Sequence, residues 1–451
     1  MFCEFRNRGN VFSPCMCYDS TGKEGLTIDN RTIIQRSLDY IEDNLQTELT
    51  AGELAEMAGF SLFHYYRLFQ QATGLPVMQY IQRRRLLHGV YSMKLGMSKT
   101  EAALTFGFDT YAGFYKAFSR EFGSTPSAFL KSSRAKRPYR IDITKEEHMT
   151  VTHKKVAGIL QNWNLGDAAI SDIYYEGTGN KNDSACYVGE DYILKYTANP
   201  GKLKKHIDVS KALESVGLIA AVPILTTGGA EYIQDGEVYF YLTKRLPGQQ
   251  MVSHRFENGN GRFVGEIIGQ LHLALEKIDD CVSEADLLAT LRDWALPNAK
   301  AALQLSDAFC KEYLETFAAL YPSLPRQIIH RDPHPGNIIC HEAQWGFIDF
   351  ELAERNARIY DPCYAATAVL SETFGQDNEK WLDIYRDILW GYDSVAPLTD
   401  SERQAIPYII LANQFVCVAW FSEQDKYAEI LEINKQMTQW LIRNFEELGS
   451  I

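Results

Sequence analysis

The chain lacks the cysteine pattern of a disulfide framework or a conventional zinc site. Its nine cysteines are odd in number and scattered, and no two of them form a Cys-x-x-Cys pair. No stretch is long and apolar enough to cross a bilayer, since the best candidate, 406–421, is interrupted by Asn413 and Gln414 and predicts a buried helix. The first residues carry charges and a proline where a signal peptide needs an apolar run. We therefore expect a cytoplasmic protein that does not associate with membranes.

Size and composition predict a folded chain of more than one domain. A length of 451 residues exceeds one ordinary core, so two or three domains are expected. A hydrophobic content of 46% and an aromatic content of 12% exclude a disordered chain. Residues 1–30 show no periodicity and predict an N-terminal tail, or a start codon placed too far upstream.

Charge is distributed unevenly along the chain. Residues 31–137 contain 14 Lys and Arg against 9 Asp and Glu, a net charge of +5, so the remainder carries -18 of the total of -13. This asymmetry indicates that the N-terminal third binds a polyanion and that the rest does not.

The positively charged region has a helical pattern that occurs twice. Thr50 with Glu53 forms a capping box before one helix, and Ser61 is placed to cap the next. Gly107-Phe108 repeats Gly59-Phe60 at an offset of 48 residues, and Phe118 with Gly123 repeats Phe69 with Gly74 at an offset of 49. Two capped copies joined by a helix around residues 80–87 predict two helix-turn-helix units, with a plain helical bundle as the alternative.

Residues 31–133 resemble the DNA-binding domain of the AraC/XylS type. The resemblance rests on Gly59-Phe60-Ser61, Arg67-Leu68-Phe69, Thr73-Gly74, Gly107-Phe108, Phe114, Phe118 and the segment 123–126. It implies that the two units read successive major-groove segments of double-stranded DNA about 34 Å apart. Lys99 and Ala102 stand where large aliphatic residues are usual, so we expect the second unit to bury less apolar area.

Position on the second helix of each unit predicts which side chains face the DNA. Arg67 and Lys116 are the main residues suited to hydrogen bonding with base edges. The full set is Leu62, Phe63, Tyr66 and Arg67 in the first unit, and Tyr111, Ala112, Gly113, Tyr115 and Lys116 in the second.

A basic, non-periodic stretch separates this region from the next. Residues 131–138 predict a solvated linker, with a phosphate-gripping arm as the alternative, and we place the linker at 134–154.

Strands and a glycine-rich turn follow. The turn contains Gly177, Gly179 and Asn182, and such a turn can lay backbone N–H groups over phosphates, although a simple hairpin looks the same. Lys195 lies within an apolar strand, where a buried lysine is costly unless it is paired. Nucleotide phosphates and a helix carboxylate would pair it, whereas an edge-strand lysine would point to water.

The segment 330–337 and the acid that follows it carry the residues best suited to chemistry. Asp332 can accept the proton of an attacking hydroxyl, while Asn337 and Asp349 supply oxygen ligands for Mg²⁺. Short apolar strands at 327–329 and 338–340 would bracket the loop. A polar surface turn is the alternative.

His-x-Asp-x-x-x-x-Asn followed by Ile-Asp-Phe resembles the catalytic loop and metal-binding segment of the aminoglycoside phosphotransferase and choline kinase group, which has a protein-kinase-like fold. Arg331 and Pro333 stand where Gly and Leu are usual. The resemblance implies ATP and Mg²⁺ as cofactors, Asp208 (or Glu214) as the helix carboxylate for Lys195, and a nucleotide hinge at 245–248. It also implies structural roles for His330 and Asp361, and we expect His272 to be structural too.

The sequence therefore predicts a multidomain chain, an all-α double helix-turn-helix domain followed by a bilobal α+β protein-kinase-like domain. The lobes are expected at 155–246 and 247–451. The expected function is a transcription regulator carrying an ATP-dependent phosphotransferase that acts on a small hydroxylated molecule. A ligand sensor without turnover is the alternative, and a DNA-binding region without a role, attached to a resistance kinase, is a third. The phosphoryl acceptor, the operator and the oligomeric state do not follow from the sequence.

Overall fold

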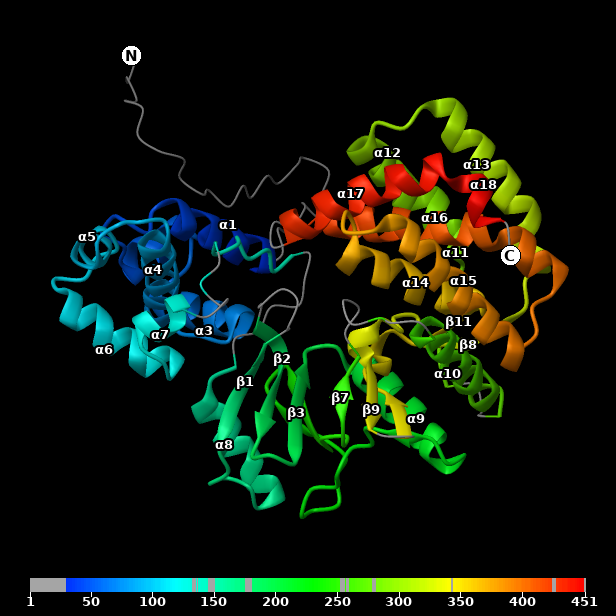
Figure 1. The fold of residues 1–451 in the computed structure, drawn as a ribbon. Coiled ribbons are helices and arrows are strands. Elements are labelled where there is room, and N and C mark those ends of the chain that lie inside the picture. Colours follow the sequence, from blue (N-terminus) through cyan, green and yellow to red (C-terminus); the bar gives the residue numbers. More distant parts are fainter. Residues whose placement is uncertain are drawn as a thin grey trace, which may run out of the picture. The chain divides into compact units, whose positions relative to one another are not determined.

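The computed structural model describes residues 30–131, 135, 137–144, 151–174, 181–251, 256, 259–277, 281–341, 344–423 and 427–449 (Figure 1). The predicted tail, Gly177 and Gly179 of the glycine-rich turn, and parts of the predicted linker lie outside these residues. The chain forms two compact units. Unit 1 comprises residues 1–161, 165–186 and 235–237, and unit 2 comprises 162–164, 187–234 and 238–451.

Unit 1 begins with seven helices in the predicted order. They are α1 (Asn30–Asp43), α2 (Ala51–Met57), α3 (Leu62–Thr73), α4 (Val77–Lys94), α5 (Lys99–Thr105), α6 (Tyr111–Phe122) and α7 (Pro126–Lys131). The capping box of Thr50 and Glu53 is present, and Ser61 caps α3 through the backbone N–H of His64, so both predictions are confirmed. The remaining described elements of unit 1 include α8 (His153–Leu160), β1 (Ile170–Tyr174) and most of β2 (Lys181–Val188).

Glycine is required at the same point of both turns. Gly59 and Gly107 have φ angles of 74° and 78°, a left-handed conformation that other residues adopt only under strain. Gly74 and Gly123 end α3 and α6 with φ angles of 81° and 62°. The internal repeat read from the sequence is thus a structural repeat.

Helix α4 contributes to two separate cores. Its first half buries Val77, Tyr80 and Ile81 in the core of the first helix-turn-helix, which includes Tyr65 and Phe69. Its second half buries Leu86, Val90 and Met93 with Phe114 and Phe118 in the core of the second. Gly89 lies so close to α6 that an added Cβ would be 2.7 Å from the Phe114 ring. The linking helix therefore fixes the separation of the two helix-turn-helix units.

Unit 2 begins with strands and one helix. Strand β3 (Tyr192–Thr197) pairs antiparallel with β6 (Val238–Lys244), and Lys195 lies opposite Tyr241. Helix α9 (Pro200–Ser215) follows β3, and the short strands β4 (Ile219–Ala220) and β5 (Ile233–Asp235) come before β6. Another sheet has the order β4-β10-β9-β7, with β7 (Gln249–Gln250), β9 (Ile338–His341) and β10 (Gln344–Phe347). Strands β8 (Arg326–Ile329) and β11 (Glu354–Ala357) pair antiparallel, and β8 and β9 confirm the strands predicted around the loop.

Helices make up most of the remainder of unit 2. They include α10 (Asn260–Leu275), α11 (Leu287–Thr290), α12 (Leu296–Leu303), α13 (Asp307–Leu320), α14 (Tyr360–Thr373), α15 (Asn378–Val395), α16 (Asp400–Ser422), α17 (Ala428–Arg443) and α18 (Phe445–Leu448). Among the described helices, α16 is long and apolar enough to cross a membrane, but 67% of its most apolar window is buried inside the protein. This agrees with the predicted buried helix. A helical region followed by a mixed α/β region is the architecture predicted from the sequence.

Two helices of unit 2 pack with their backbones in contact. An added Cβ at Gly265 of α10 would lie 1.9 Å from the carbonyl oxygen of Ile388 on α15, and one at Gly391 of α15 would lie 2.1 Å from that of Arg262. Gly261 and Gly269 extend the same glycine face of α10. Any side chain larger than hydrogen on this face would force the helices apart.

Candidate functional site

One buried carboxylate, that of Asp361, holds the backbone of the predicted catalytic loop in place. Asp361, at the start of α14, accepts the backbone N–H groups of His330 at 2.8 Å and Arg331 at 3.0 Å. It also lies 3.0 Å from Nε2 of His272, whose Nδ1 is 2.8 Å from the hydroxyl of Tyr392. Asp361 and His272 are completely or almost completely buried. Their contacts join α10, α14 and α15 to the loop.

His330 connects the loop to the segment that carries Asp349. Its Nδ1 accepts the backbone N–H of Asp332 at 3.3 Å, so its Nε2 carries the proton and donates to the carbonyl of Ile348 at 3.0 Å. Burial lowers the pKa of His330, which keeps the ring neutral in this arrangement. One imidazole thus fixes the backbone beside both acids.

Asn337 lies next to Asp332. Its side-chain N–H₂ group donates to the carbonyl of Asp332 at 2.9 Å and lies 3.4 Å from Oδ2 of the same residue. The backbone carbonyl of Asn337 accepts the backbone N–H of Ile348 at 3.0 Å. The base and both metal ligands expected from the sequence therefore belong to one bonded arrangement within unit 2.

Arg331 shows why glycine is usual at its position. Its φ angle is 76°, in the left-handed region that costs a non-glycine residue on the order of 1 kcal/mol. The guanidinium compensates, because it pairs with Glu354 at 2.9 Å and lies 4.0 Å above the ring of Tyr360. The departure from the usual residue is thus accommodated locally.

Lys195 reaches the segment that follows β10. Its Nζ lies 2.9 Å from Oδ1 of Asp349 and 3.1 Å from Oε1 of Glu351. Burial alone would lower the pKa of Lys195, but the negative charges around it, led by Asp349, hold the pKa well above its ordinary value. The same pairing outweighs the opposite effect of burial on Asp349 and lowers its pKa to about 2. Both groups are charged at neutral pH.

The structure does not bring Asp208 to Lys195. Asp208 pairs with Lys204, one turn away on α9, and the carboxylates that contact Lys195 among the described residues are Asp349 and Glu351. The helix presents His206, not an acid, to the ring of Tyr241, with the ring centres 5.1 Å apart. Sequence reasoning missed Glu351, although its place directly after Asp349-Phe350 was the available signal.

Two further residues near Asp332 were not expected from the sequence. Tyr364 of α14 is one, since burial and the neighbouring Asp332 carboxylate hold its pKa well above the ordinary value. His334 is the other. Its Nδ1 accepts the N–H of Gly336 at 3.0 Å, and its Nε2 lies 3.9 Å from Oδ2 of Asp332.

Two other segments predicted to contact the nucleotide, the one around Asn182 and the hinge, are defined in the structure by contacts within the protein. Asn182 lies on β2 in unit 1 and accepts the N–H of Ser184 at 2.9 Å. In the predicted hinge, Gly248 has a φ angle of 111°, and an added Cβ would lie 2.2 Å from the carbonyl oxygen of Cys340. Only glycine fits there, because the hinge crosses β9 at backbone contact distance.

The donor set around Asp349 suits Mg²⁺ better than a transition metal. Among the described residues there is no cluster of three His, Cys, Asp or Glu side chains that could hold a metal ion. One carboxylate and one amide oxygen, completed by water and phosphate oxygens, form the kind of site that Mg²⁺ uses. Asn337 and Asp349 fit that description.

Most of the predicted DNA-facing side chains lie on the outer faces of α3 and α6, but Tyr66 and Tyr111 pack against the two cores. Phe63 is 82% exposed, and Leu62 and Tyr115 are also exposed. Arg67, Ala112, Gly113 and Lys116 are exposed, whereas Tyr66 and Tyr111 are half-buried. Tyr65 and Phe114, one position away from members of this set, are fully buried in the two cores. Helical periodicity thus separates the core from the candidate interface in both helix-turn-helix units.

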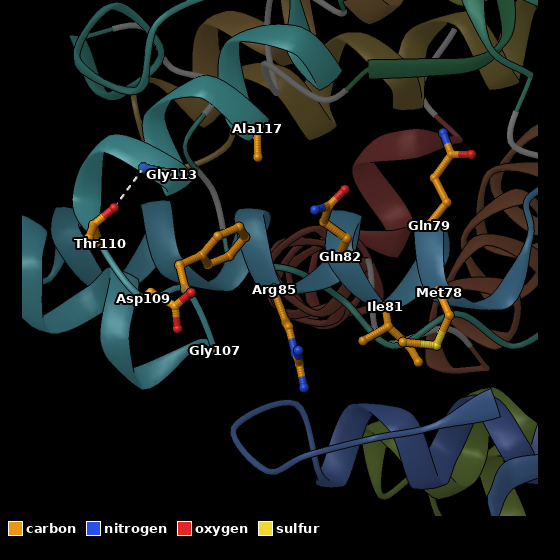
Figure 2. A pocket seen from close by; sticks show the side chains of 11 residues that line it. Met78, Gln79, Ile81, Gln82, Arg85, Gly107, Asp109, Thr110, Gly113 and Ala117 are labelled. Atoms are coloured by element: carbon orange, nitrogen blue, oxygen red, sulfur yellow. Dashed lines mark hydrogen bonds between the residues drawn. The ribbon is translucent and has the colours of Figure 1, made fainter. Parts of the chain in front are cut away.

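A hollow of about 570 Å³ lies between α4 and the N-terminal turn of α6, and Figure 2 shows the side chains that line it. Thr110 caps α6 by accepting the N–H of Gly113 at 3.1 Å, and both residues line the hollow. Arg85 forms part of its wall and donates to the backbone carbonyl groups of Leu45 and Thr47. The first turn of α6 is therefore open on the side facing α4.

These features define a chain that joins a double helix-turn-helix domain to a phosphotransferase-type domain. The family described as "Helix-turn-helix domain" matches residues 54–132, and the "Phosphotransferase enzyme family" matches 177–398. The chain belongs to the AraC-type helix-turn-helix family, as its curated relatives show.

The curated relatives match the N-terminal part of the chain. The transposon Tn10 TetD protein of Escherichia coli is 34% identical over 103 residues, covering 22% of this chain and 74% of that protein. The HTH-type transcriptional activator AarP of Providencia stuartii is 30% identical over 102 residues, covering 22% and 76%. The transcriptional regulator Rob of Salmonella typhimurium is 30% identical over 158 residues, or 33% of this chain, which spans only 55% of that regulator's length.

A solved structure matches about two thirds of the chain. A microcompartment-associated aminopropanol kinase aligns with a TM-score of 0.51 and 12% identity, covering 65% of this chain and 98% of that kinase. At this identity the likeness establishes the fold, which is the kinase-like fold expected from the sequence.

Proposed function

We propose that this protein is a cytoplasmic transcription regulator whose kinase-like domain transfers the γ-phosphoryl group of ATP to a hydroxyl of a small molecule, with Mg²⁺. The observation that carries the proposal is the bonded arrangement in unit 2. Lys195 contacts Asp349, His330 ties the segment of Asp349 to Asp332, and Asn337 donates to Asp332. Each residue type has the chemistry that its role requires.

In the proposed mechanism the protein acts by positioning and by balancing charge. Asp332 orients the acceptor hydroxyl and takes its proton as the new O–P bond forms, while ADP leaves with the electrons of the broken bond. Lys195 holds the phosphates, and Asp361 with His330 keeps the loop rigid. Mg²⁺ bound by Asn337 and Asp349 would supply charge neutralisation at the phosphates.

The test of the kinase-like domain is a ligand screen followed by a turnover assay. With Mg²⁺ and a non-hydrolysable ATP analogue present, we expect the unfolding midpoint of the full chain to rise, and to rise further with a compatible alcohol. Candidate acceptors are aminoglycosides, amino alcohols and sugars. Removing Mg²⁺ with a chelator should abolish the nucleotide-dependent rise. Without the metal, the negative charge of Asp349 would repel the phosphates. A midpoint that nucleotide never changes would contradict the proposal.

We further propose that the outward faces of α3 and α6 read double-stranded DNA. Substituting Arg67→Ala or Lys116→Ala should each weaken sequence-selective binding by roughly 5- to 100-fold, as expected for a side chain that contacts a base edge or phosphate. The measurement is footprinting and fluorescence anisotropy with a selected operator at fixed salt. Arg36→Ala on α1, which also removes an exposed cation, is the matched control and should keep wild-type affinity. Equal losses in all three variants would indicate nonspecific electrostatics instead.

The ligand-sensor alternative differs in one measurable respect. A sensor binds nucleotide or small molecule without turnover, and its occupancy changes operator affinity. Operator binding should therefore be measured with and without Mg²⁺, the ATP analogue and each ligand that raises the unfolding midpoint. Ligand-dependent DNA affinity without ADP release would favour the sensor.

A further inference from the structure

Lys195 has a carboxylate partner that neither the sequence nor the family assigns. The Lys195 side chain is 15% exposed, and an ammonium group so far buried needs a nearby negative charge. Asp349 provides one at 2.9 Å, but the proposed metal site requires the same carboxylate. Glu351, at 3.1 Å, provides a second one.

Glu351 is itself held in place. The hydroxyl of Tyr241 donates to Oε1 of Glu351 at 3.1 Å, and Tyr241 lies directly opposite Lys195 in the β3–β6 pair. Tyr241 is fully buried against Leu203 and Ile207 of α9. The carboxylate is therefore oriented by a side chain that the sheet and the helix keep rigid.

The turn between the two acids explains how both reach one lysine. Asp349 adopts a left-handed conformation with a φ angle of 71° and begins the short helix η6 (Phe350–Leu352). Phe350 is fully buried, with its ring centre 4.7 Å from that of His330. With Phe350 anchored in the core, the acids on either side of it both contact Nζ of Lys195.

Helix α9 supplies no acid in this position. The residue that it places against Tyr241 is His206, whose Nε2 lies 3.1 Å from the carbonyl of Ala221. Burial, with Lys195 nearby, lowers the pKa of His206 to about 4, so the ring is neutral and cannot balance the ammonium charge. Asp208 is paired with Lys204 instead.

We infer that Glu351, held by Tyr241, is the positioning residue for Lys195 in place of a helix carboxylate. The inference rests on the proposed phosphotransferase function. With Asp349 holding a metal and the lysine turned to the phosphates, Glu351 would still keep the amine in position. Both carboxylates that contact Lys195, those of Asp349 and Glu351, lie on the proposed metal-binding segment. The ion pair of Lys195 therefore forms without a movement of α9.

The test measures the affinity of the full chain for a non-hydrolysable ATP analogue with Mg²⁺. Glu351→Gln removes the charge and keeps the shape, and we expect the dissociation constant to rise about tenfold, as for a lost charge-assisted hydrogen bond. Tyr241→Phe removes one hydroxyl and should raise it about threefold. Glu266→Gln breaks an exposed pair with Arg262 and should leave it unchanged. Unfolding midpoints without nucleotide show whether each variant is folded.

A double-mutant cycle separates positioning from a merely structural role. In a Lys195→Met background, Glu351→Gln should cause no further loss, because the residue it positions is gone. An equal loss with and without Lys195 would overturn the inference, as would a larger loss from Asp208→Asn than from Glu351→Gln. If the wild-type chain binds no Mg²⁺–nucleotide, the proposed function fails as a whole. If it binds and Glu351→Gln binds equally well, only this inference fails.

Discussion

Asp332→Asn should reduce phosphoryl transfer by about 10³-fold while leaving nucleotide affinity within about twofold of wild type. The carboxylate is the proposed acceptor of the hydroxyl proton, and loss of a general base removes roughly 10²- to 10⁴-fold of rate, about 4 kcal/mol at the centre of that range. An amide is the same size, so the contact from Asn337 to the carbonyl of residue 332 can remain. Steady-state ADP release with the acceptor found in the screen measures the first quantity, and titration with the ATP analogue measures the second.

Asp383→Asn is the matched control for this prediction. Asp383 is a 79% exposed acid of α15 paired with Arg386 one turn away, so its loss should change neither rate nor affinity. An Asp332→Asn variant that keeps more than a tenth of the wild-type rate would mean that another group takes the proton. His334, whose Nε2 lies 3.9 Å from Asp332, would then be the residue to substitute next.

Gly265→Ala should destabilise unit 2 by about 3 kcal/mol or more, the upper part of the range for overpacking a rigid contact. The added Cβ would lie 1.9 Å from the Ile388 carbonyl oxygen and 2.6 Å from the Tyr392 nitrogen, both backbone atoms that cannot rotate away. Activity should fall as well, because separating α10 from α15 pulls His272 away from Tyr392 and Asp361. A midpoint lower by roughly 6–12 °C in a thermal scan would match this stability loss.

Gly158→Ala is the corresponding control. An added Cβ at Gly158, within α8, meets nothing within 4 Å, so alanine should be neutral or slightly stabilising through its better helix propensity. If Gly265→Ala is equally harmless, the two backbones are not in contact in solution.

Features that depend on local sequence were predictable. The caps at Thr50 and Ser61, the repeated turn glycines and the strands around the catalytic loop follow from hydrogen-bonding capacity, backbone freedom and apolar pattern within a few residues. The proximity of Asp332, Asn337 and Asp349 was also accessible, because a short hairpin joins their positions.

Pairings between distant segments were less accessible. Spacing along α9 suggested Asp208 for Lys195, but which turn of a helix faces a strand depends on packing, and Leu203 and Ile207 direct His206 inward. Glu351 lies 156 positions from Lys195 in the sequence. Its contact with Lys195 depends on the left-handed backbone at Asp349, and no glycine adjacent to Asp349 indicates that conformation in the sequence. The compensation of the strained Arg331 by Glu354 and Tyr360 is likewise a tertiary effect.

If α3 and α6 read DNA as proposed, the continuous helix α4 limits the spacing of the two DNA segments that they can contact. One extra base pair between the two contacted segments shifts the second by roughly 3.4 Å and rotates it by roughly 35° around the duplex axis. A single α-helix embedded in both cores has no joint with which to follow that screw motion. In the proposed complex, tolerance of spacer length would therefore come from bending or twisting of the DNA, because the distance between α3 and α6 is fixed by the protein.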